Sequence, residues 1–261
     1  ARVFTGSAGI GFAYAHEPIV VTPADRAPVV AMVGNRALDD PGNFGVEHND
    51  VLVERDLGWM MCWPETPQEA FDLVLIAYKV CEDPKVLLPM AINCDGNFIT
   101  HVRFPVEIPD DIEAIKKFVP PKPPERINVL HPDKPVSIAP HVDYWWGAEI
   151  RRQMDQAMKN AKEVIKAVHE EYNKLFDGRG GPPFIEEYMT EDAEIALLGM
   201  GGMCMPIRAG VREMRKEGVK VGLVKLRRFR PFPFEELQEV LKKFSVIAVM
   251  DNNFSLGSPY Y

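Results

Sequence analysis

The sequence is short of cysteine, of positive charge and of long apolar runs, and each shortage excludes a class of protein. Its four cysteines stand singly, which excludes a disulfide framework and a zinc or iron–sulfur site built from this chain alone. A formal net charge of −8 argues against a surface for nucleic acid or an anionic membrane. No apolar run approaches the roughly 18 residues of a membrane span, and no signal peptide opens the chain. We therefore expect a cytoplasmic protein with buried, reduced thiols.

The first part of the chain alternates short apolar runs with one amphipathic helix. The runs at 27–33 (APVVAMV), 59–63 and 85–92 (KVLLPMAI) are typical of strands in a parallel sheet that helices cover on both faces. Thr66 followed by proline is typical of a helix N-cap, and the helix is expected to continue through 70–81. This alternation predicts an α/β fold with a parallel sheet.

The chain opens unlike the start of such a domain. Residues 1–18 indicate a Gly/Ser-rich loop followed by the beginning of a helix of small residues. We therefore expect the first strand and helices of the fold to lie outside this numbering.

A proline-rich segment divides the chain. Residues 118–140 contain seven prolines, which disfavour a sheet interior and favour an extended conformation. We expect a first domain at 1–118, a linker at 119–146 and a second domain at 147–261 that opens with a long helix. Strands expected at 194–198, 218–225 and 245–250 alternate with helices at 204–217 and 234–244. The second domain is thus predicted to contain a βαβαβ unit.

The glycine-rich turn at 199–202 and the basic run at 225–230 have two interpretations each. Gly-Met-Gly-Gly suggests a dinucleotide loop, but it lacks the full G-x-G-x-x-G pattern and an acidic residue at the end of the next strand. Tight packing of strand against helix is the favoured interpretation. The basic run is short and ends in Pro-Phe-Pro, so we interpret it as a local feature after a strand.

Arg36 comes three residues after the first predicted strand, at the carboxyl edge where open α/β sheets bind ligands. Asp39 and Asp40 follow in a turn, so a salt bridge that closes this turn is one interpretation. The other is a planar fork that binds a substrate carboxylate. His48 with Asp50 suggests a metal site only weakly, and support of the loop by hydrogen bonds is favoured.

Four stretches in order resemble one enzyme family. They are "APVVAMVGNRALDDPGNFGVEHNDV", "ERDLGWMMCWPETPQEAFDLVLIAYKV", "VLLPMAINCDGNFITH" and "GVKVGLVKLRRFRPFP". Together, from about Val3 to Ser255, they resemble the alpha subunit of the 2-oxoacid:ferredoxin oxidoreductases. The resemblance implies a pyrimidine-type thiamine domain followed by a domain like the C-terminal one of transketolase. It also implies an enzyme in which thiamine diphosphate attacks the substrate carbonyl, carbon dioxide leaves and electrons pass through iron–sulfur clusters to ferredoxin.

The resemblance assigns roles to four residues. Arg36 matches the arginine that faces the substrate carboxylate in the family. Asn35, His48 and Asp50 match the same loop and are assigned a supporting role. The glutamate that activates the aminopyrimidine ring lies, in the family, upstream of the point where this numbering begins. Glu17 and Glu47 lack its context, so no cofactor-binding residue is assigned.

The metal motif of thiamine enzymes is incomplete in this sequence. Cys94-Asp95-Gly96 lacks the first glycine of G-D-G, and Asn252-Asn253 lies too far away to complete it. We therefore expect a chain that is inactive alone and shares thiamine diphosphate with a partner chain. Mg²⁺ and the [4Fe-4S] clusters are expected on partner subunits, and ferredoxin is expected as electron acceptor. Neither nucleic acid nor a membrane is an expected partner.

The loop after Arg36 favours one substrate over another. Asp39 and Asp40 stand where relatives that use pyruvate tend to carry small residues, and a carboxylate beside a methyl group is poorly solvated. With Phe44 as a wall of the pocket, oxalate is therefore the favoured substrate, as in one member of the family. Pyruvate or another 2-oxoacid is the alternative. A non-catalytic assembly subunit is a further alternative, which the intact Arg36 opposes.

Overall fold

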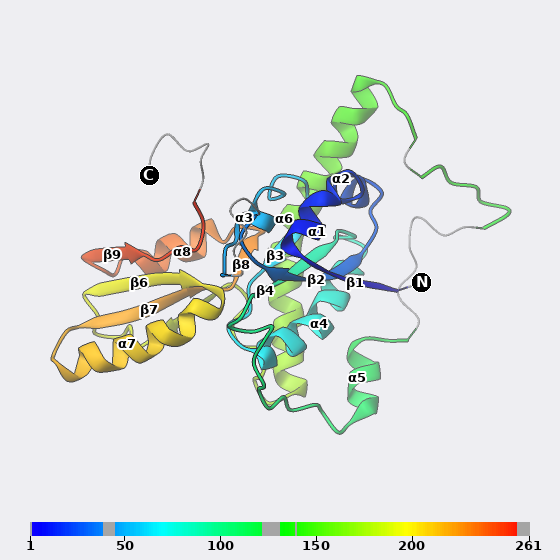
Figure 1. The fold of residues 1–261 in the computed structure, drawn as a ribbon. Helices are drawn as coiled ribbons and strands as arrows, with labels where there is room; N and C mark the ends of the chain where they lie inside the picture. Colours follow the sequence, from blue (N-terminus) through cyan, green and yellow to red (C-terminus); the bar gives the residue numbers. More distant parts are fainter. Residues whose placement is uncertain (1, 39–44, 122–130, 139, 255–261) are drawn as a thin grey trace.

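The computed structural model describes residues 2–38, 45–121, 131–138 and 140–254 (Figure 1). It contains two α/β units, each built on a largely parallel sheet. The first sheet has the strand order β1 (Val3–Ala8), β2 (Val29–Asn35), β4 (Met90–Asp95), β3 (Met60–Cys62) and β8 (Arg228–Arg230). All neighbours in it are parallel except β3 and β8. The predicted α/β class is confirmed.

The two central strands begin and end later than the apolar runs suggest. β2 covers Val29–Asn35 in place of 27–33, and β4 covers Met90–Asp95 in place of 85–92. The residues before β4 form a turn, because the Asp83 side chain accepts a hydrogen bond from the Lys85 N–H (2.8 Å). Because β2 ends at Asn35, Arg36 directly follows the last residue of this strand.

The opening residues form a strand, so the expectation of a Gly/Ser-rich loop there is wrong. β1 pairs in parallel with β2 along its whole length, from Val3 opposite Val29 to Ala8 opposite Gly34. All six residues of β1 are exposed, so the backbone ladder to β2 outweighs the low strand propensity of its small residues. Two short helices follow, α1 (Gly9–Tyr14) and α2 (His16–Ala24).

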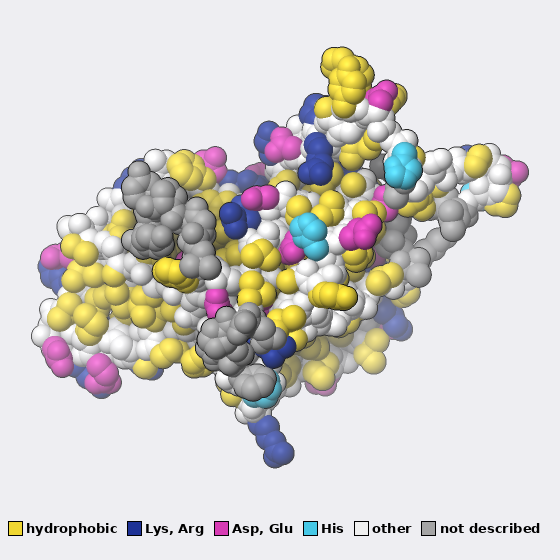
Figure 2. Space-filling view, turned by 45° about the horizontal axis from the view of Figure 1, so that its top comes forward, with side chains coloured by type: hydrophobic (Ala, Val, Ile, Leu, Met, Phe, Trp, Pro, Cys, Tyr) yellow, Lys and Arg dark blue, Asp and Glu magenta, His cyan; other side chains and the backbone are white. Residues whose placement is uncertain are grey.

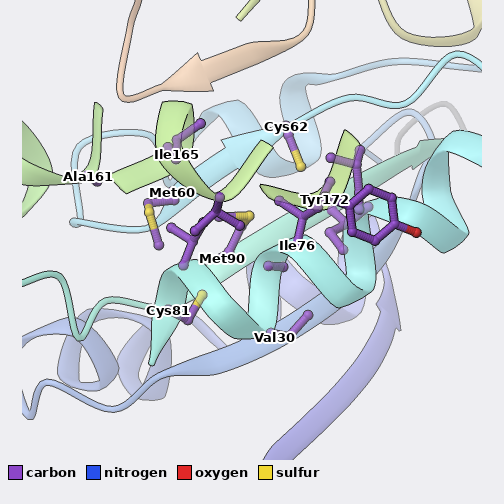
Figure 3. Packing of buried hydrophobic residues seen from close by; sticks show 14 of the residues in the cluster. Val30, Met60, Cys62, Ile76, Cys81, Met90, Ala161, Ile165 and Tyr172 are labelled. Atoms are coloured by element: carbon purple, nitrogen blue, oxygen red, sulfur yellow. The ribbon is translucent and has the colours of Figure 1, made fainter. Parts of the chain in front are cut away.

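Two long helices cover one face of the first sheet. α4 (Pro67–Cys81) begins as predicted, since the Thr66 hydroxyl accepts a hydrogen bond from the Glu69 N–H. α6 (Tyr144–Leu175) packs beside it, and the Tyr172 hydroxyl donates to Asp72 at 2.6 Å. Figure 3 shows side chains of both helices meeting those of β2, β3 and β4 in one hydrophobic core. The shorter helices are α3 (Asn49–Leu52) and α5 (Ile112–Phe118).

α6 packs against the first sheet, although a long helix is expected to open the second domain. Its apolar stripe is buried in the same core as β2, β3 and β4. An apolar stripe along a helix has to be covered by another element. The first sheet covers the stripe of α6. The limits 1–118, 119–146 and 147–261 stay a proposal.

The second unit contains the predicted βαβαβ arrangement. Its strands follow the order β5 (Ile185–Tyr188), β7 (Val221–Leu226), β6 (Ile195–Met200) and β9 (Val246–Val249). β6, β7 and β9 are parallel, and β5 adds an antiparallel edge that the sequence pattern did not predict. The connections are a turn of 3-10 helix (Gly201–Met203), α7 (Cys204–Lys216) and α8 (Phe234–Leu241).

Buried charges of the basic run join the two units. Glu69 of α4 lies 2.7 Å from Lys225 Nζ and 2.7 Å from Arg227 Nη2. Lys225 also lies 3.0 Å from Glu65. Both basic side chains are almost fully buried, so this part of the run forms an internal ion cluster. Among the described residues, no helix is both long and apolar enough to cross a membrane.

Hydrophobic side chains are exposed at several places, and two of them can be followed in Figure 2. Figure 2 shows a hydrophobic tip where α6 begins, formed by the exposed Tyr144, Trp145 and Trp146. It also shows hydrophobic side chains over the second unit, where β9 exposes Val246 and Val249.

Candidate functional site

The site lies at the carboxyl edge of the first sheet. β2 ends at Asn35 and β4 ends at Asp95, and these two residues are register partners. Both are fully buried, although they are polar. Crevices at the carboxyl ends of parallel strands are where open α/β sheets bind ligands. Arg36 leaves the sheet at this edge, half-buried.

Asp50 fixes the backbone at the point where Arg36 leaves β2. Its Oδ1 accepts a hydrogen bond from Asn35 Nδ2 (2.8 Å) and its Oδ2 accepts one from the Arg36 N–H (2.9 Å). The carboxylate also packs on Gly9, where an added Cβ would lie 1.6 Å from Oδ2. Glycine at this position therefore allows the close approach of α1 to the clamp. The supporting role of Asn35 and Asp50 stays a prediction, which these contacts favour.

The Asp50 carboxyl is unusually easy to protonate. Burial raises its pKa to about 6, although the hydrogen bonds from Arg36 and Asn35 work to lower it. Asn35 Oδ1 has no hydrogen-bond partner among the described residues. Rotation of that amide by 180° would offer Oδ1 to a protonated Asp50, so the hydrogen bond between these two side chains can form in either protonation state.

The raised pKa of Asp50 predicts a dependence of stability on pH. The unfolded carboxyl ionises near 3.8 and the folded one near 6, so the folded state binds the extra proton between these values. Stability from this group is therefore full below pH 4 and is lost as the pH rises to about 6, at no more than about 1.4 kcal/mol per pH unit.

We expect Asp50→Asn to lack this loss. Urea unfolding of the wild type and the variant from pH 4 to 8 measures it, with Asp110→Asn on the exposed surface as the control. The difference in free energy between wild type and Asp50→Asn should change between pH 4 and 6 and stay constant above 7. A difference that does not change with pH would contradict the raised pKa.

Asp95 connects the loop after Arg36 with the second unit. Its Oδ1 accepts a hydrogen bond from His48 Nε2 (2.9 Å), and its Oδ2 accepts one from the Gly202 N–H (2.7 Å). The His48 ring lies 5.3 Å from that of Trp63, centre to centre. His48 Nδ1 and Trp63 Nε1 are buried with no hydrogen-bond partner among the described residues.

The glycine turn after β6 packs against the Asp95 carboxylate. Gly201 has φ +75°, and a Cβ there would lie 2.8 Å from Asp95 Oδ2. A Cβ on Gly199 would lie 2.9 Å from Ile207 of α7. Both approaches agree with the packing interpretation of this turn, and the N–H of Gly202, which a dinucleotide loop would offer to a phosphate, is already bonded to Asp95.

Asp39, Asp40 and Phe44 lie outside the described residues, so the salt bridge with Arg36 and the pocket wall stay untested. Sequence reasoning missed Trp63 and the pairing of Asp95. Their signals were an aromatic residue at the end of the apolar run 59–63 and an acidic residue shortly after the apolar run 85–92.

The described residues contain no cluster of side chains that could ligate a metal ion. Within 2–38, 45–121, 131–138 and 140–254, no group of three or more His, Cys, Asp or Glu side chains is placed to hold a metal. Both oxygens of Asp95 are already hydrogen-bonded. Burial raises the pKa of the Cys62 thiol to about 11 and that of Cys94 to about 12, which disfavours the thiolate that a cluster needs.

A cavity of about 370 Å³ lies near the same edge of the sheet, beside α4. Its wall is apolar and includes Met32, Phe71, Cys94 and Ile99. Such a lining does not suit a carboxylate, so Arg36 and its clamp stay the candidate for binding an anion.

Comparison with known families covers most of the chain. Residues 1–170 match the family described as pyruvate flavodoxin/ferredoxin oxidoreductase, thiamine diphosphate-binding. Residues 193–260 match pyruvate:ferredoxin oxidoreductase core domain II.

Curated relatives agree with these matches. The pyruvate synthase subunit PorA of Methanocaldococcus jannaschii is 40% identical over 257 residues, which cover 98% of this chain and 66% of the relative. PorA of Pyrococcus furiosus is 40% identical, with 98% and 64% covered. The ketoisovalerate oxidoreductase subunit VorA of Pyrococcus horikoshii is 38% identical, also with 98% and 64% covered. The chain thus spans about two thirds of the length of these relatives.

One solved structure shares the fold. It is a 2-oxoglutarate:ferredoxin oxidoreductase from Magnetococcus marinus, with a TM-score of 0.64 and 14% identity. The similarity covers 97% of this chain and 46% of that one.

Proposed function

This chain belongs to the pyruvate flavodoxin/ferredoxin oxidoreductase family, and on that premise we propose that it is the substrate-binding alpha subunit of a 2-oxoacid:ferredoxin oxidoreductase. The observation that carries the proposal is Arg36 at the carboxyl end of β2, with its backbone N–H held by buried Asp50. A guanidinium is a planar fork that binds a carboxylate through two parallel hydrogen bonds. In this proposal Arg36 orients the substrate carboxylate, and Asn35 and Asp50 keep the base of its loop in place.

We further propose that the chain works only with partner subunits. The relatives are named as subunits, and this chain spans about two thirds of their length. Among its described residues, no group of three or more His, Cys, Asp or Glu side chains is placed to hold a metal. Thiamine diphosphate would therefore be shared with a partner chain that also supplies Mg²⁺ and the [4Fe-4S] clusters, and ferredoxin would accept the electrons. The four free, buried cysteines suit the cytoplasm as the compartment.

The relatives correct the expected order of substrates. Asp39 and Asp40 favour oxalate in the sequence analysis. The relatives are named for pyruvate and ketoisovalerate, so the comparisons do not support oxalate as the substrate. We therefore propose pyruvate as the first candidate. Oxalate stays a second candidate because Asp39 and Asp40 lie only three and four residues after Arg36 in the sequence.

The assembled complex decides among these proposals. Reduction of a viologen dye by the purified complex is measured with pyruvate, 2-oxoglutarate and oxalate in turn. Turnover of pyruvate or 2-oxoglutarate supports the proposed class of substrate, and turnover of oxalate alone supports the second candidate. A complex whose turnover is unchanged without this chain would indicate an assembly subunit.

Asp39→Ala is expected to change the preference between substrates. Removal of the carboxylate makes room for a methyl group and removes a polar partner from a substrate that is polar at both ends. The ratio of kcat/KM for oxalate to that for pyruvate should fall by about tenfold. An unchanged ratio would mean that Asp39 serves only the turn. The same measurement on Asp40→Ala separates the two adjacent carboxylates.

A further inference from the structure

Asp95 bonds to both α/β units at once. One carboxylate oxygen accepts from His48, 47 residues earlier in the chain, and the other accepts from the N–H of Gly202, 107 residues later. Asp95 and His48 are fully buried. Hydrogen bonds to a buried carboxylate are strong, and leaving such a group without partners is costly. The position of His48 is therefore tied to that of the glycine turn after β6.

A second set of contacts ties the same segment to the end of β9. The His48 backbone N–H donates to the carbonyl oxygen of Asn252 (2.9 Å). Asn49 Nδ2 donates to the carbonyl oxygen of Phe254 (3.0 Å). The segment after β9 thus holds residues 48 and 49 directly, and the turn after β6 holds His48 through Asp95.

The helical turn α3 connects these anchors with Arg36. The Leu52 N–H donates to the His48 carbonyl oxygen at 2.9 Å, which makes residues 48–52 one rigid turn. Asp50 lies inside that turn and accepts the hydrogen bond from the Arg36 N–H. A displacement of His48 therefore moves Asp50, and with it the point where Arg36 leaves β2.

We propose that Asp95 is a positioning residue through which the second α/β unit sets the place of Arg36 at the substrate site. The connection runs from the glycine turn to Asp95, from Asp95 to His48, and through α3 and Asp50 to the Arg36 backbone. This inference rests on the proposed role of Arg36 in binding the substrate carboxylate. It gives the second unit a part in substrate binding without contact between its side chains and the substrate.

Two glycines of the second unit provide a matched pair of variants. Gly201 (φ +75°) and Gly218 (φ +85°) both lie in the left-handed region, so alanine strains the backbone similarly at each. An added Cβ at Gly201 would lie 2.8 Å from Asp95 Oδ2, whereas one at Gly218 would meet no atom within 4 Å. Gly201→Ala therefore displaces Asp95 in addition to straining a turn, and Gly218→Ala only strains a turn.

In the assembled complex, Gly201→Ala should raise the KM for the 2-oxoacid by about tenfold and change kcat by less than about twofold. Gly218→Ala should leave both constants as they are. Hydrogen–deuterium exchange should become faster at residues 45–52 in Gly201→Ala only. If the two variants agree in KM and in exchange, the proposal is overturned.

A second variant and a separate readout cover the cases in which Gly201→Ala does not fold or the complex is inactive. If Gly201→Ala does not fold, Asp95→Asn replaces it. The amide keeps an acceptor for the Gly202 N–H but loses the negative charge that faces His48. An unchanged KM and unchanged hydrogen–deuterium exchange in Asp95→Asn would also overturn the proposal. Faster exchange at residues 45–52 supports the connection even in a complex that turns over no 2-oxoacid. That lack of turnover would instead contradict the proposed function.

Discussion

Replacement of Glu69 by alanine is expected to lower the free energy of unfolding by about 3 kcal/mol. The Glu69 side chain is only 11% exposed and lies 2.7 Å from both Lys225 and Arg227. Burial works to raise the pKa of this carboxyl, but the charges of Arg227 and Lys225 outweigh it and lower the pKa to about 2. Its removal leaves two buried cations with fewer partners. Lys225 keeps Glu65 at 3.0 Å, which places the cost at the lower end of the range for broken buried pairs.

Glu149 provides the control for this prediction. Its pKa is also lowered to about 2, by a hydrogen bond from Arg152, but the pair lies on the exposed surface of α6. Solvent screens such a pair, so Glu149→Ala should leave the urea midpoint unchanged. If Glu69→Ala costs no more than Glu149→Ala, the ion cluster does not hold the two units together.

The Glu69 contribution also has a defined pH range. Its pKa is lower in the folded state than the ordinary 4.5, so the stabilisation is complete above about pH 4.5 and is lost as the pH falls toward 2. The difference between wild type and Glu69→Ala should therefore stay constant from pH 5 to 8 and shrink in acid.

Arg36→Lys in the assembled complex is expected to reduce kcat/KM for the 2-oxoacid by about 2–4 kcal/mol in transition-state stabilisation. Lysine keeps the positive charge but loses the planar fork that binds both carboxylate oxygens. The backbone N–H that Asp50 accepts is present in either residue, so folding should be unaffected. Steady-state kinetics with each substrate and thermal unfolding of the same preparations measure the two effects.

Arg103→Lys, at an exposed position in the segment after β4, serves as the control. It should leave kcat/KM as it is. Activity of Arg36→Lys within about twofold of the wild type would mean that Arg36 only closes its turn.

The strands that the sequence predicted are those with strong local patterns. The short runs around Val30 and Ile92 would place apolar side chains on both faces of a strand. This pattern is typical of a parallel strand that is buried on both faces. β1, β5 and β8 were missed because their residues are small, polar or charged. Such short strands form by pairing with a neighbour that already exists, and that neighbour is distant in the sequence.

What the sequence alone determined is the place of Arg36. An apolar run followed by turn residues puts it at the carboxyl edge of a sheet, and neighbouring residues in the chain are enough to establish that. Tertiary structure decided what surrounds it: Asp50 under its backbone, His48 against Asp95, and Asp95 against the turn at Gly202. These contacts join residues 14, 47 and 107 positions apart. Local pattern cannot specify such pairs, because a buried polar group finds its partner only when the sheets and helices around it have packed.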